Sequence, residues 1–210
     1  SHDLRIGSVG KAVDDVEVTL SENDEILIKS PGIIKGYWNN PDKTAETIRQ
    51  GWLYTGDVGR VDEDGFVYIV DRIKDIIITA GGKNITPSEI ENQLKFSPYI
   101  SDAVVVGDKR PYLTCLVMID HENVEKFAQD NDVPFTNYTS LCHTQAVRDL
   151  VWQEIERVNL KFAKVETIKK FHLIDQLLDP EDDELTPTMK LKRKVVNEKY
   201  IDLIDDMYGS

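Results

Sequence analysis

The sequence has few of the residues that form disulfides or bind metals, with two cysteines and four histidines among 210 residues. Cys115 lies in an apolar, strand-like segment far from Cys142, so we expect a buried reduced thiol rather than a disulfide or a nucleophile. This usage is typical of a reducing cytoplasm. The histidines show neither HxxH nor HxxxH spacing, so no metal site is expected. They are His2, His121, His143 and His172.

Long hydrophobic runs are also missing. The longest, such as Ile76–Ile78 and Ala103–Val106, are too short for a transmembrane segment. No basic segment precedes an apolar stretch, so no signal peptide is expected. The first residues resemble the remainder of a purification tag, and we expect the chain to begin inside a longer protein.

Basic residues are outnumbered, 25 against 38 acidic ones, which gives a net charge of −13. Nucleic acid binding needs a basic face, so it is not expected. A strongly anionic membrane surface is disfavoured in the same way, although peripheral membrane contact of a longer parent protein stays open. Neither a Gly-x-Ser-x-Gly motif nor a complete glycine-rich phosphate loop is present. Nothing in the composition indicates an oligomeric state.

The pattern of apolar residues predicts an α+β fold, rich in strands at first and mixed later. A boundary is expected near Arg72–Lys74. The strands expected before or at it are Val9–Val18, Glu25–Lys29, Trp52–Tyr54, Val58–Val61, Phe66–Val70 and Lys74–Ala80. "DEDG" predicts a hairpin turn after the fourth of them. A short helix is expected over Asp42–Arg49, after the loop "SPGIIKGYWNN".

The second part is expected to form a small mixed domain with a strand pair and helices. "ISDAVVVG" and "YLTCLVMID" predict two strands buried on one face, and "TIKKFHLI" a third. Thr86 is the expected N-cap of a helix that has Pro87 first and Glu89 third, a capping box. Further helices are expected over His121–Asp130, Thr144–Lys164 and Leu191–Met207, before which "DQLLDPEDDELTPTMK" predicts a polar loop.

Three groups of residues have the chemistry of a nucleotide site, and each also has a structural explanation. Asp57, in "TGD", can bind vicinal hydroxyls, or form an Asx turn, which is commoner. Arg72 can contact a nucleotide, or pair with Asp71 or Asp75. A lysine of "LTPTMKLKRK" can neutralise phosphate charge, or be solvated in a loop. Gly81–Gly82 permit close approach of a ligand, or simply a turn.

Taken in order, three motifs resemble the adenylate-forming (ANL) superfamily of acyl-CoA synthetases, luciferases and peptide-synthetase adenylation domains. "GIIKGYWNNPDKT" is similar to its G-x-x-x-G-Y-x-N-x-P-x-x-T stretch, and "GWLYTGDVG" to its G-W-x-x-T-G-D motif. "DRIKDIIITAGGKNITPSEIE" is similar to its R-x-K-D…G-G-x-N-I-x-P-x-E-I-E motif. The resemblance covers nearly the whole chain, from about Gly7 onward.

The tail resembles long-chain fatty acid–CoA ligases, in which "LTPT-x-K-x-K-R" replaces P-x-T-x-x-G-K of the wider family. The glycine before the catalytic lysine is absent, so the resemblance leaves Lys190 and Lys192 as candidates. Lys190 is preferred because an arginine follows three residues on, as in the wider pattern. The resemblance also implies that 1–73 end a large N-terminal domain and that 74–210 form the mobile C-terminal domain.

The resemblance implies a two-step reaction in which ATP and a fatty acid form acyl-AMP and pyrophosphate, and coenzyme A then forms the thioester. It implies that Asp57, Arg72 and Tyr54 bind the nucleotide and that Lys190 stabilises the first transition state. Lys74 would be the hinge. Gly81, Gly82 and Lys83 would line the coenzyme A channel. The Mg²⁺ ligand, the acyl pocket and the phosphate loop would lie upstream, so the chain alone is expected to be inactive.

Two alternatives remain at this point. One is an adenylation domain that loads an amino or hydroxy acid onto a carrier protein, which would lack the long-chain form of the tail. The other is a non-catalytic interaction module, for which an acidic surface and exposed helices would be sufficient.

Overall fold

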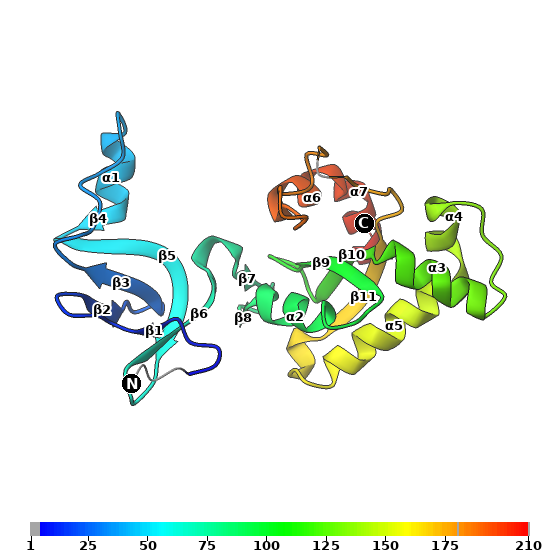
Figure 1. Cartoon of the computed structure of the whole chain (residues 1–210), viewed down its shortest axis with the longest axis horizontal. Helices are drawn as coiled ribbons and strands as arrows, with labels where there is room; N and C mark the ends of the chain where they lie inside the picture. Colours follow the sequence, from blue (N-terminus) through cyan, green and yellow to red (C-terminus); the bar gives the residue numbers. More distant parts are fainter. Residues whose placement is uncertain (1–4, 180, 210) are drawn as a thin grey trace. The chain divides into compact units, whose positions relative to one another are not determined.

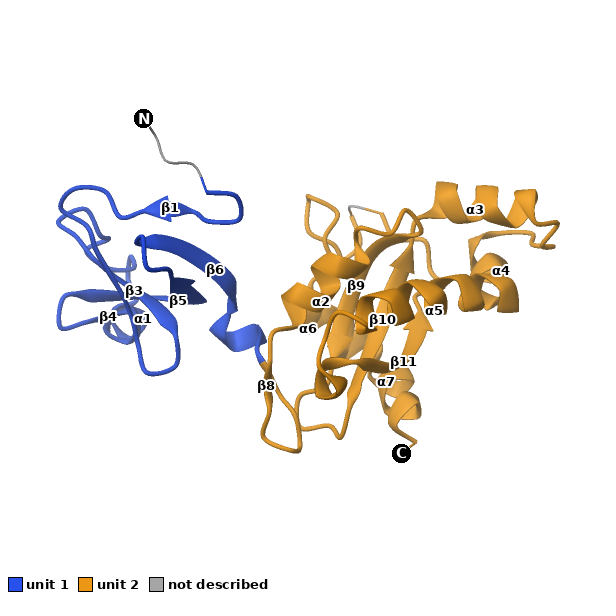
Figure 2. Cartoon of the chain, turned by 90° about the horizontal axis from the view of Figure 1, so that it is seen from below, with its two compact units in different colours: residues 1–76 blue, residues 77–210 orange. Residues whose placement is uncertain are grey.

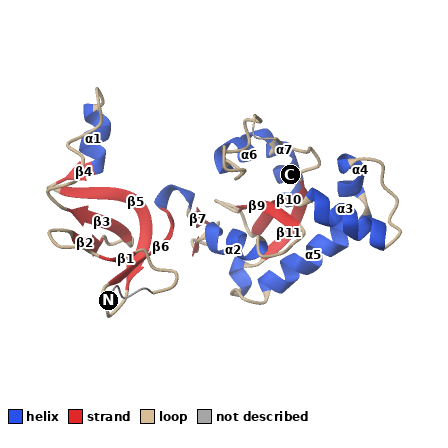
Figure 3. Cartoon of the chain, viewed as in Figure 1, coloured by secondary structure: helices blue, strands red, loops and turns tan. Residues whose placement is uncertain are grey.

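The computed structural model describes residues 5–179 and 181–209. They form two compact units, one up to Ile76 and one from Ile77 onward (Figure 2). Mixed α and β elements make up the chain (Figure 3), which confirms the α+β class. No helix of the described part is long and apolar enough to cross a membrane.

Unit 1 is built on an antiparallel six-stranded sheet in the order β1-β6-β5-β3-β2, with β4 beside β5 (Figure 1). Asn40 caps the helix α1 by accepting a hydrogen bond from the backbone N–H of Lys43. The 3₁₀ turn η1 (Ile73–Asp75) follows the last strand. The elements are β1 (Gly10–Lys11), β2 (Glu17–Leu20), β3 (Glu25–Lys29), α1 (Pro41–Thr47), β4 (Ile48–Arg49), β5 (Trp52–Val61) and β6 (Phe66–Arg72).

Three expectations for unit 1 were wrong. Val9–Val18 is not one strand, since β1 and the start of β2 are separated by a turn at Asp14–Asp15, where Asp15 has φ 62°. The two strands expected within 52–61 are one, because β3 pairs along both halves with a register shift between Glu25 and Leu27. Lys74–Ala80 is a strand only at β7 (Ile77–Ile78), because η1 takes its first residues.

The β5–β6 turn confirms the predicted hairpin and is fastened by Asp62. One carboxylate oxygen accepts hydrogen bonds from the backbone N–H groups of Asp64 (3.0 Å) and Phe66 (2.9 Å). The other accepts from the Arg5 guanidinium (2.6 Å) and the Tyr68 hydroxyl (3.1 Å). Desolvation opposes ionisation, but these bonds outweigh it and lower the pKa of Asp62 to about 2.

The stability of unit 1 should therefore depend on pH through Asp62. Because its folded pKa is lowered, its contribution is present above the unfolded pKa of about 4 and is lost as the pH falls toward about 2. Asp62→Asn should lower the urea midpoint at neutral pH, and the difference from the native chain should shrink below about pH 4. Asp64→Asn is the control, since that carboxylate is 62% exposed and pairs with Arg5 alone. A difference that stays constant with pH would contradict this assignment.

Unit 2 has a three-stranded sheet in the order β11-β10-β9 and a two-stranded hairpin of β7 and β8. The strand β10 is antiparallel to β9 and parallel to β11. The elements are β7 (Ile77–Ile78), β8 (Asn84–Ile85), α2 (Pro87–Leu94), β9 (Ile100–Val106), β10 (Leu113–Ile119), α3 (His121–Asp130), α4 (Tyr138–His143), α5 (Gln145–Asn159), η2 (Lys164–Glu166), β11 (Ile168–Leu173), α6 (Arg193–Lys199) and α7 (Ile201–Tyr208).

The sheet is buried on both faces, not on one as the sequence suggested. Cys115 and Val117 of β10 belong to a core shared with α2 and α5, whereas Leu116 and Met118 belong to a second core with α6 and α7. Side chains alternate between faces along a strand, so the helices cover both sides. Cys115 is a fully buried free thiol, as predicted.

The helices of unit 2 also differ from expectation at several ends. The last expected helix is two, since it breaks at the buried Tyr200. The expected helix 144–164 ends at Asn159, and α4 was not predicted. The capping box at Thr86 is wrong, because its side chain makes no cap hydrogen bond.

Candidate functional site

Three of the predicted nucleotide and hinge residues line one cavity in unit 1. The cavity has a volume of about 850 Å³, and Tyr54, Arg72 and Lys74 contribute to its wall. The guanidinium of Arg49 lies 4.6 Å from the centre of the Tyr54 ring. The charged residues that line the cavity are Glu22, Glu25, Glu46, Lys43, Arg49, Arg72 and Lys74. Bases thus outnumber acids by one in this cavity, although the chain as a whole is strongly acidic.

Asp57 and Arg72 form a pair across the sheet. They are directly opposite each other on β5 and β6, and Nε of Arg72 lies 2.9 Å from a carboxylate oxygen of Asp57. Arg72 thus pairs with Asp57, a partner that the sequence did not indicate, and its backbone N–H donates to the carboxylate of Asp71 at 2.8 Å. The Arg72 side chain is 53% exposed, so part of its guanidinium is available to a ligand.

Gly56 explains the middle residue of "TGD". Its φ is +73°, a backbone conformation that residues with a side chain rarely adopt. A Cβ at this position would lie 3.4 Å from the guanidinium of Arg72. Its N–H donates to the carboxylate of Glu25 at 2.8 Å. The glycine therefore lets the chain turn beside Arg72 without crowding it.

Gly81, Gly82 and Lys83 lie in the turn between β7 and β8. Gly82 needs to be glycine for the turn itself, since its φ is +78° and its N–H donates to Thr79 O at 2.8 Å. Gly81 has no such need: a Cβ there would come no closer than 3.9 Å to another group. The ammonium of Lys83 lies 3.9 Å from the carboxylate of Glu166. The turn thus accounts for one glycine of the pair.

Lys190 lies at the end of a tight loop. The Thr186 hydroxyl accepts from the Lys190 N–H (3.0 Å), and the Thr186 N–H donates to Lys190 O (2.8 Å). Met189 has φ +61°, the left-handed conformation that glycine adopts most readily. The residue before Lys190 thus has a backbone conformation in which glycine would carry no strain.

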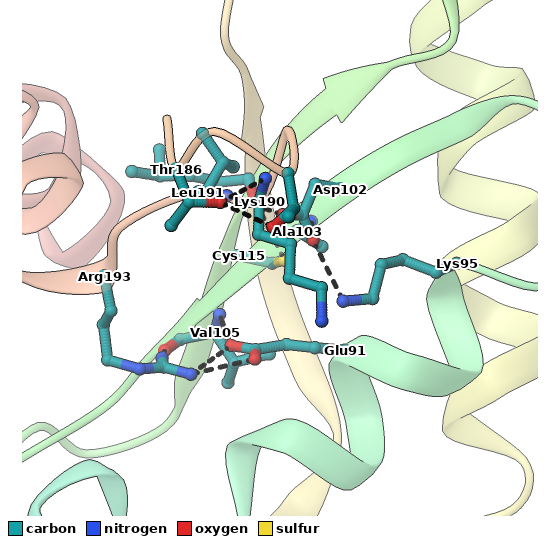
Figure 4. Close-up of polar contacts among 12 residues, drawn as sticks. Glu91, Lys95, Asp102, Ala103, Val105, Cys115, Thr186, Lys190, Leu191 and Arg193 are labelled. Carbon is teal, nitrogen blue, oxygen red and sulfur yellow. Dashed lines mark hydrogen bonds and ion pairs between the residues drawn. The ribbon is translucent and has the colours of Figure 1, made fainter. Parts of the chain in front are cut away.

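Two buried carboxylates hold the segment that follows Lys190 (Figure 4). Asp102, 4% exposed, accepts from the Leu191 N–H at 2.8 Å and pairs with Lys95 at 3.2 Å. Glu91, 8% exposed, accepts two hydrogen bonds from Arg193 at 2.7 and 2.8 Å. Burial raises the pKa of Glu91, and Arg193 opposes this. No ion pair within 5–179 and 181–209 involves the ammonium of Lys190.

Lys192 has a similar exposure but a different place in the loop. Its N–H donates to the carbonyl of Glu184 at 2.7 Å, and it is the N-cap of α6. The Glu184 carboxylate is buried and pairs with Lys199. Residue 192 therefore anchors the loop through its backbone, next to the start of a helix.

Sequence reasoning missed Glu91, Asp102 and their partners. Glu91 ends the "SEIE" stretch and Arg193 ends "LKR", but 102 residues separate them, and only the fold brings them together. Asp102 interrupts an apolar strand, which is the signal that could have shown it. In the described part of the chain, no group of three or more His, Cys, Asp or Glu side chains could hold a metal ion.

Solved structures with this fold include an adenylation domain and a coenzyme A synthetase. The adenylation domain of a carboxylate reductase from Mycobacterium chelonae superposes with a TM-score of 0.76 at 22% identity, covering 95% of this chain and 32% of that one. O-succinylbenzoate coenzyme A synthetase from Bacillus subtilis, in complex with AMP, gives 0.62 at 25% identity, covering 90% and 35%. The fold of this chain is thus shared with parts of proteins of the adenylate-forming superfamily, which the motifs resembled.

The chain belongs to the AMP-binding enzyme C-terminal domain family, whose model matches residues 74–210. A long-chain-fatty-acid–CoA ligase of Mycobacterium tuberculosis, FadD15, is 41% identical over 211 residues, covering 99% of this chain and 35% of that protein. Human long-chain-fatty-acid–CoA ligase ACSBG1 is 36% identical over 231 residues, covering 99% and 32%. The chain thus spans about a third of the length of these relatives.

Proposed function

We propose that this chain is the C-terminal part of a long-chain fatty acid–CoA ligase that forms AMP. In the proposed reaction a fatty carboxylate attacks the α-phosphate of ATP, giving acyl-AMP and pyrophosphate. The thiol of coenzyme A then attacks the acyl carbon, giving the thioester and releasing AMP. The observation that carries the proposal is the Lys190 loop, in which left-handed Met189 replaces the family glycine and Arg193 follows three residues after the lysine.

The residues of unit 1 have the chemistry needed to hold the nucleotide. Asp57 would accept hydrogen bonds from the ribose hydroxyls, while Arg72 holds that carboxylate in place and contacts the nucleotide with its exposed part. Tyr54 would offer its ring beside Arg49. In this proposal 1–73 are the end of a large N-terminal domain. The cavity beside these residues supports the assignment.

The residues of unit 2 would serve both steps. Lys190 would neutralise the charge that develops between the carboxylate and the α-phosphate, and a cation held in advance costs no reorganisation at that moment. Lys74, in η1 at the end of unit 1, would be the hinge about which the domain 74–210 rotates between the steps. Gly81, Gly82 and Lys83 would line the channel for the pantetheine arm. The turn does not require glycine at residue 81, which supports this role.

Mg²⁺ would bind with ATP through residues upstream of this chain. When bound, it would supply charge neutralisation at the phosphates. Fatty acid, ATP and coenzyme A are the proposed small-molecule partners. A cytoplasmic location is part of the same proposal and is supported by the two buried free thiols.

The full-length protein provides the test. With a long-chain fatty acid, ATP, Mg²⁺ and coenzyme A it should produce acyl-CoA together with AMP and pyrophosphate. Formation of ADP and phosphate instead would contradict an acyl-adenylate route. An adenylation domain that loads a carrier protein would activate an amino or hydroxy acid and transfer it to a carrier thiol, which gives a different product.

The chain by itself should be inactive, because the acyl pocket and phosphate loop are not among its residues. Incubation with ATP, Mg²⁺ and palmitate should yield no acyl-AMP above the level without protein. Calorimetric titration of the chain with AMP and with coenzyme A measures whether unit 1 and unit 2 still bind these ligands. Acyl-AMP formation by these 210 residues would disprove the assignment of domains.

A further inference from the structure

The strand β11 has one free edge. It is the end strand of its sheet, and in the described ranges 5–179 and 181–209 no strand pairs with its outer side. The helices α5 and α7 both pack against it. Trp152 of α5 stacks on Phe171 of β11, with the ring centres 5.8 Å apart. Leu203 and Met207 of α7 line the neighbouring cavity. The edge therefore lies between two helices.

Asn159 shows what this edge binds. Its side-chain amide donates to Ile168 O at 2.9 Å and accepts from the Ile168 N–H, also at 2.9 Å. One residue of an antiparallel neighbouring strand makes the same reciprocal pair of hydrogen bonds with an edge strand. The amide imitates a partner strand only at the first residue of β11. Lys170–Leu173 pair with β10 on the inner side, and the backbone groups of 169–173 that face outward have no strand partner in the described residues.

A groove follows this edge. Two adjoining cavities, of about 450 Å³ and about 770 Å³, share Trp152 and Lys169 in their walls. Leu160, in the wall of the larger cavity, is 89% exposed. The groove thus offers apolar surface over an elongated path, which suits an extended chain better than a compact ligand.

The groove is cationic although the chain is acidic. Arg148, Lys169 and Lys170 line the smaller cavity together with a single carboxylate, that of Asp206, and the larger cavity adds one acid and one further base, Glu156 and Arg157. No ion pair within the described residues holds any of the three bases of the smaller cavity. Arg148 lies 5.7 Å from the Phe171 ring centre. In a chain of net charge −13, such a cluster of unpaired bases indicates a negatively charged occupant.

We propose that the free edge of β11 binds an extended acidic segment of a partner protein, which adds to the sheet as a fourth strand. Main-chain hydrogen bonds would supply affinity, and Arg148, Lys169 and Lys170 would select acidic side chains. Edge lysines commonly guard against self-association. In this chain, Lys169 and Lys170 would repel the same two lysines of a second copy and so disfavour dimerisation. The same two lysines would attract an acidic segment. This role is separate from the proposed ligase reaction.

The test uses the whole 210-residue chain and a fluorescent peptide of alternating valine and glutamate. Fluorescence anisotropy should show binding that weakens with salt, while the valine–lysine peptide and the backbone N-methylated peptide should not bind. Hydrogen exchange of the amides of Lys169–Leu173 should slow when the valine–glutamate peptide is present. These results would establish strand addition at this edge.

Charge-reversed variants separate this edge from general attraction. Lys169→Glu with Lys170→Glu should weaken binding about tenfold, whereas Lys169→Arg with Lys170→Arg should retain it. Lys35→Glu with Lys126→Glu makes the same change of charge at exposed lysines outside the groove and should leave the affinity unchanged. Equal binding of the lysine peptide, protection of amides elsewhere, or no binding at low salt would overturn the proposal. So would dimerisation of the chain through this edge.

Discussion

If the full-length protein catalyses the proposed reaction, replacing Lys190 by alanine is expected to slow acyl-adenylate formation by about a hundredfold to a thousandfold. The reason is the loss of a fixed positive charge where negative charge develops on the carboxylate and the α-phosphate. Thioester formation from supplied acyl-AMP should stay near the native rate, because that step does not need this charge. Rapid-quench measurement of each half-reaction separates the two effects.

Lys192→Ala is the matched control for that experiment. Lys192 is equally exposed and two residues away, but its described contacts are made by the backbone, which alanine keeps. It should change the adenylation rate by less than about threefold, in line with a surface substitution. If Lys192→Ala instead abolishes adenylation and Lys190→Ala does not, the assignment based on Met189 and Arg193 is wrong.

Replacing Glu91 by alanine is expected to destabilise unit 2 by about 3–5 kcal/mol. The substitution leaves the Arg193 guanidinium, 21% exposed, without its carboxylate and also removes the acceptor of the Val105 N–H. Urea unfolding of the chain, followed by the fluorescence of Trp152 in the same unit, measures the loss. Glu89→Ala is the control, because Glu89 is exposed on the same helix and should cost less than about 1 kcal/mol.

A second variant separates a lost ion pair from a general packing defect. Glu91→Met with Arg193→Leu replaces both charges by apolar side chains and should recover most of the stability, since no buried charge is left unpaired. If the double variant is as unstable as Glu91→Ala, the ion pair is not the cause. If Glu91→Ala lowers the free energy of unfolding by less than about 1 kcal/mol, the Glu91–Arg193 pair behaves as an exposed ion pair, which would contradict its burial.

Local sequence patterns predicted much of the fold. His121–Asp130 is a helix with the predicted bounds, since Asp120 caps it through the Asn123 N–H. The "DEDG" turn closes the hairpin as predicted, but the register at the turn would place Asp71 opposite Asp57. Arg72 lies opposite Asp57 only because of a register shift between Val58 and Gly59, which the sequence pattern did not indicate.

Other features depend on contacts that no local pattern contains. The break at Tyr200 between α6 and α7 follows from the burial of that ring in the second core, although the apolar spacing on either side fits one long helix. The short α4 is stabilised by the reciprocal hydrogen bonds of Asn137 and Ser140. The polar sequence around these residues did not indicate a helix. Arg193 and Glu91 meet only because α6 packs beside β9.

The most direct test of the account is ATP–pyrophosphate exchange by the full-length protein without coenzyme A. The account predicts exchange that depends on a long-chain fatty acid and Mg²⁺ and that is lost in the Lys190→Ala variant. Exchange driven by amino acids and not by fatty acids, or no exchange with any carboxylic acid, would contradict it.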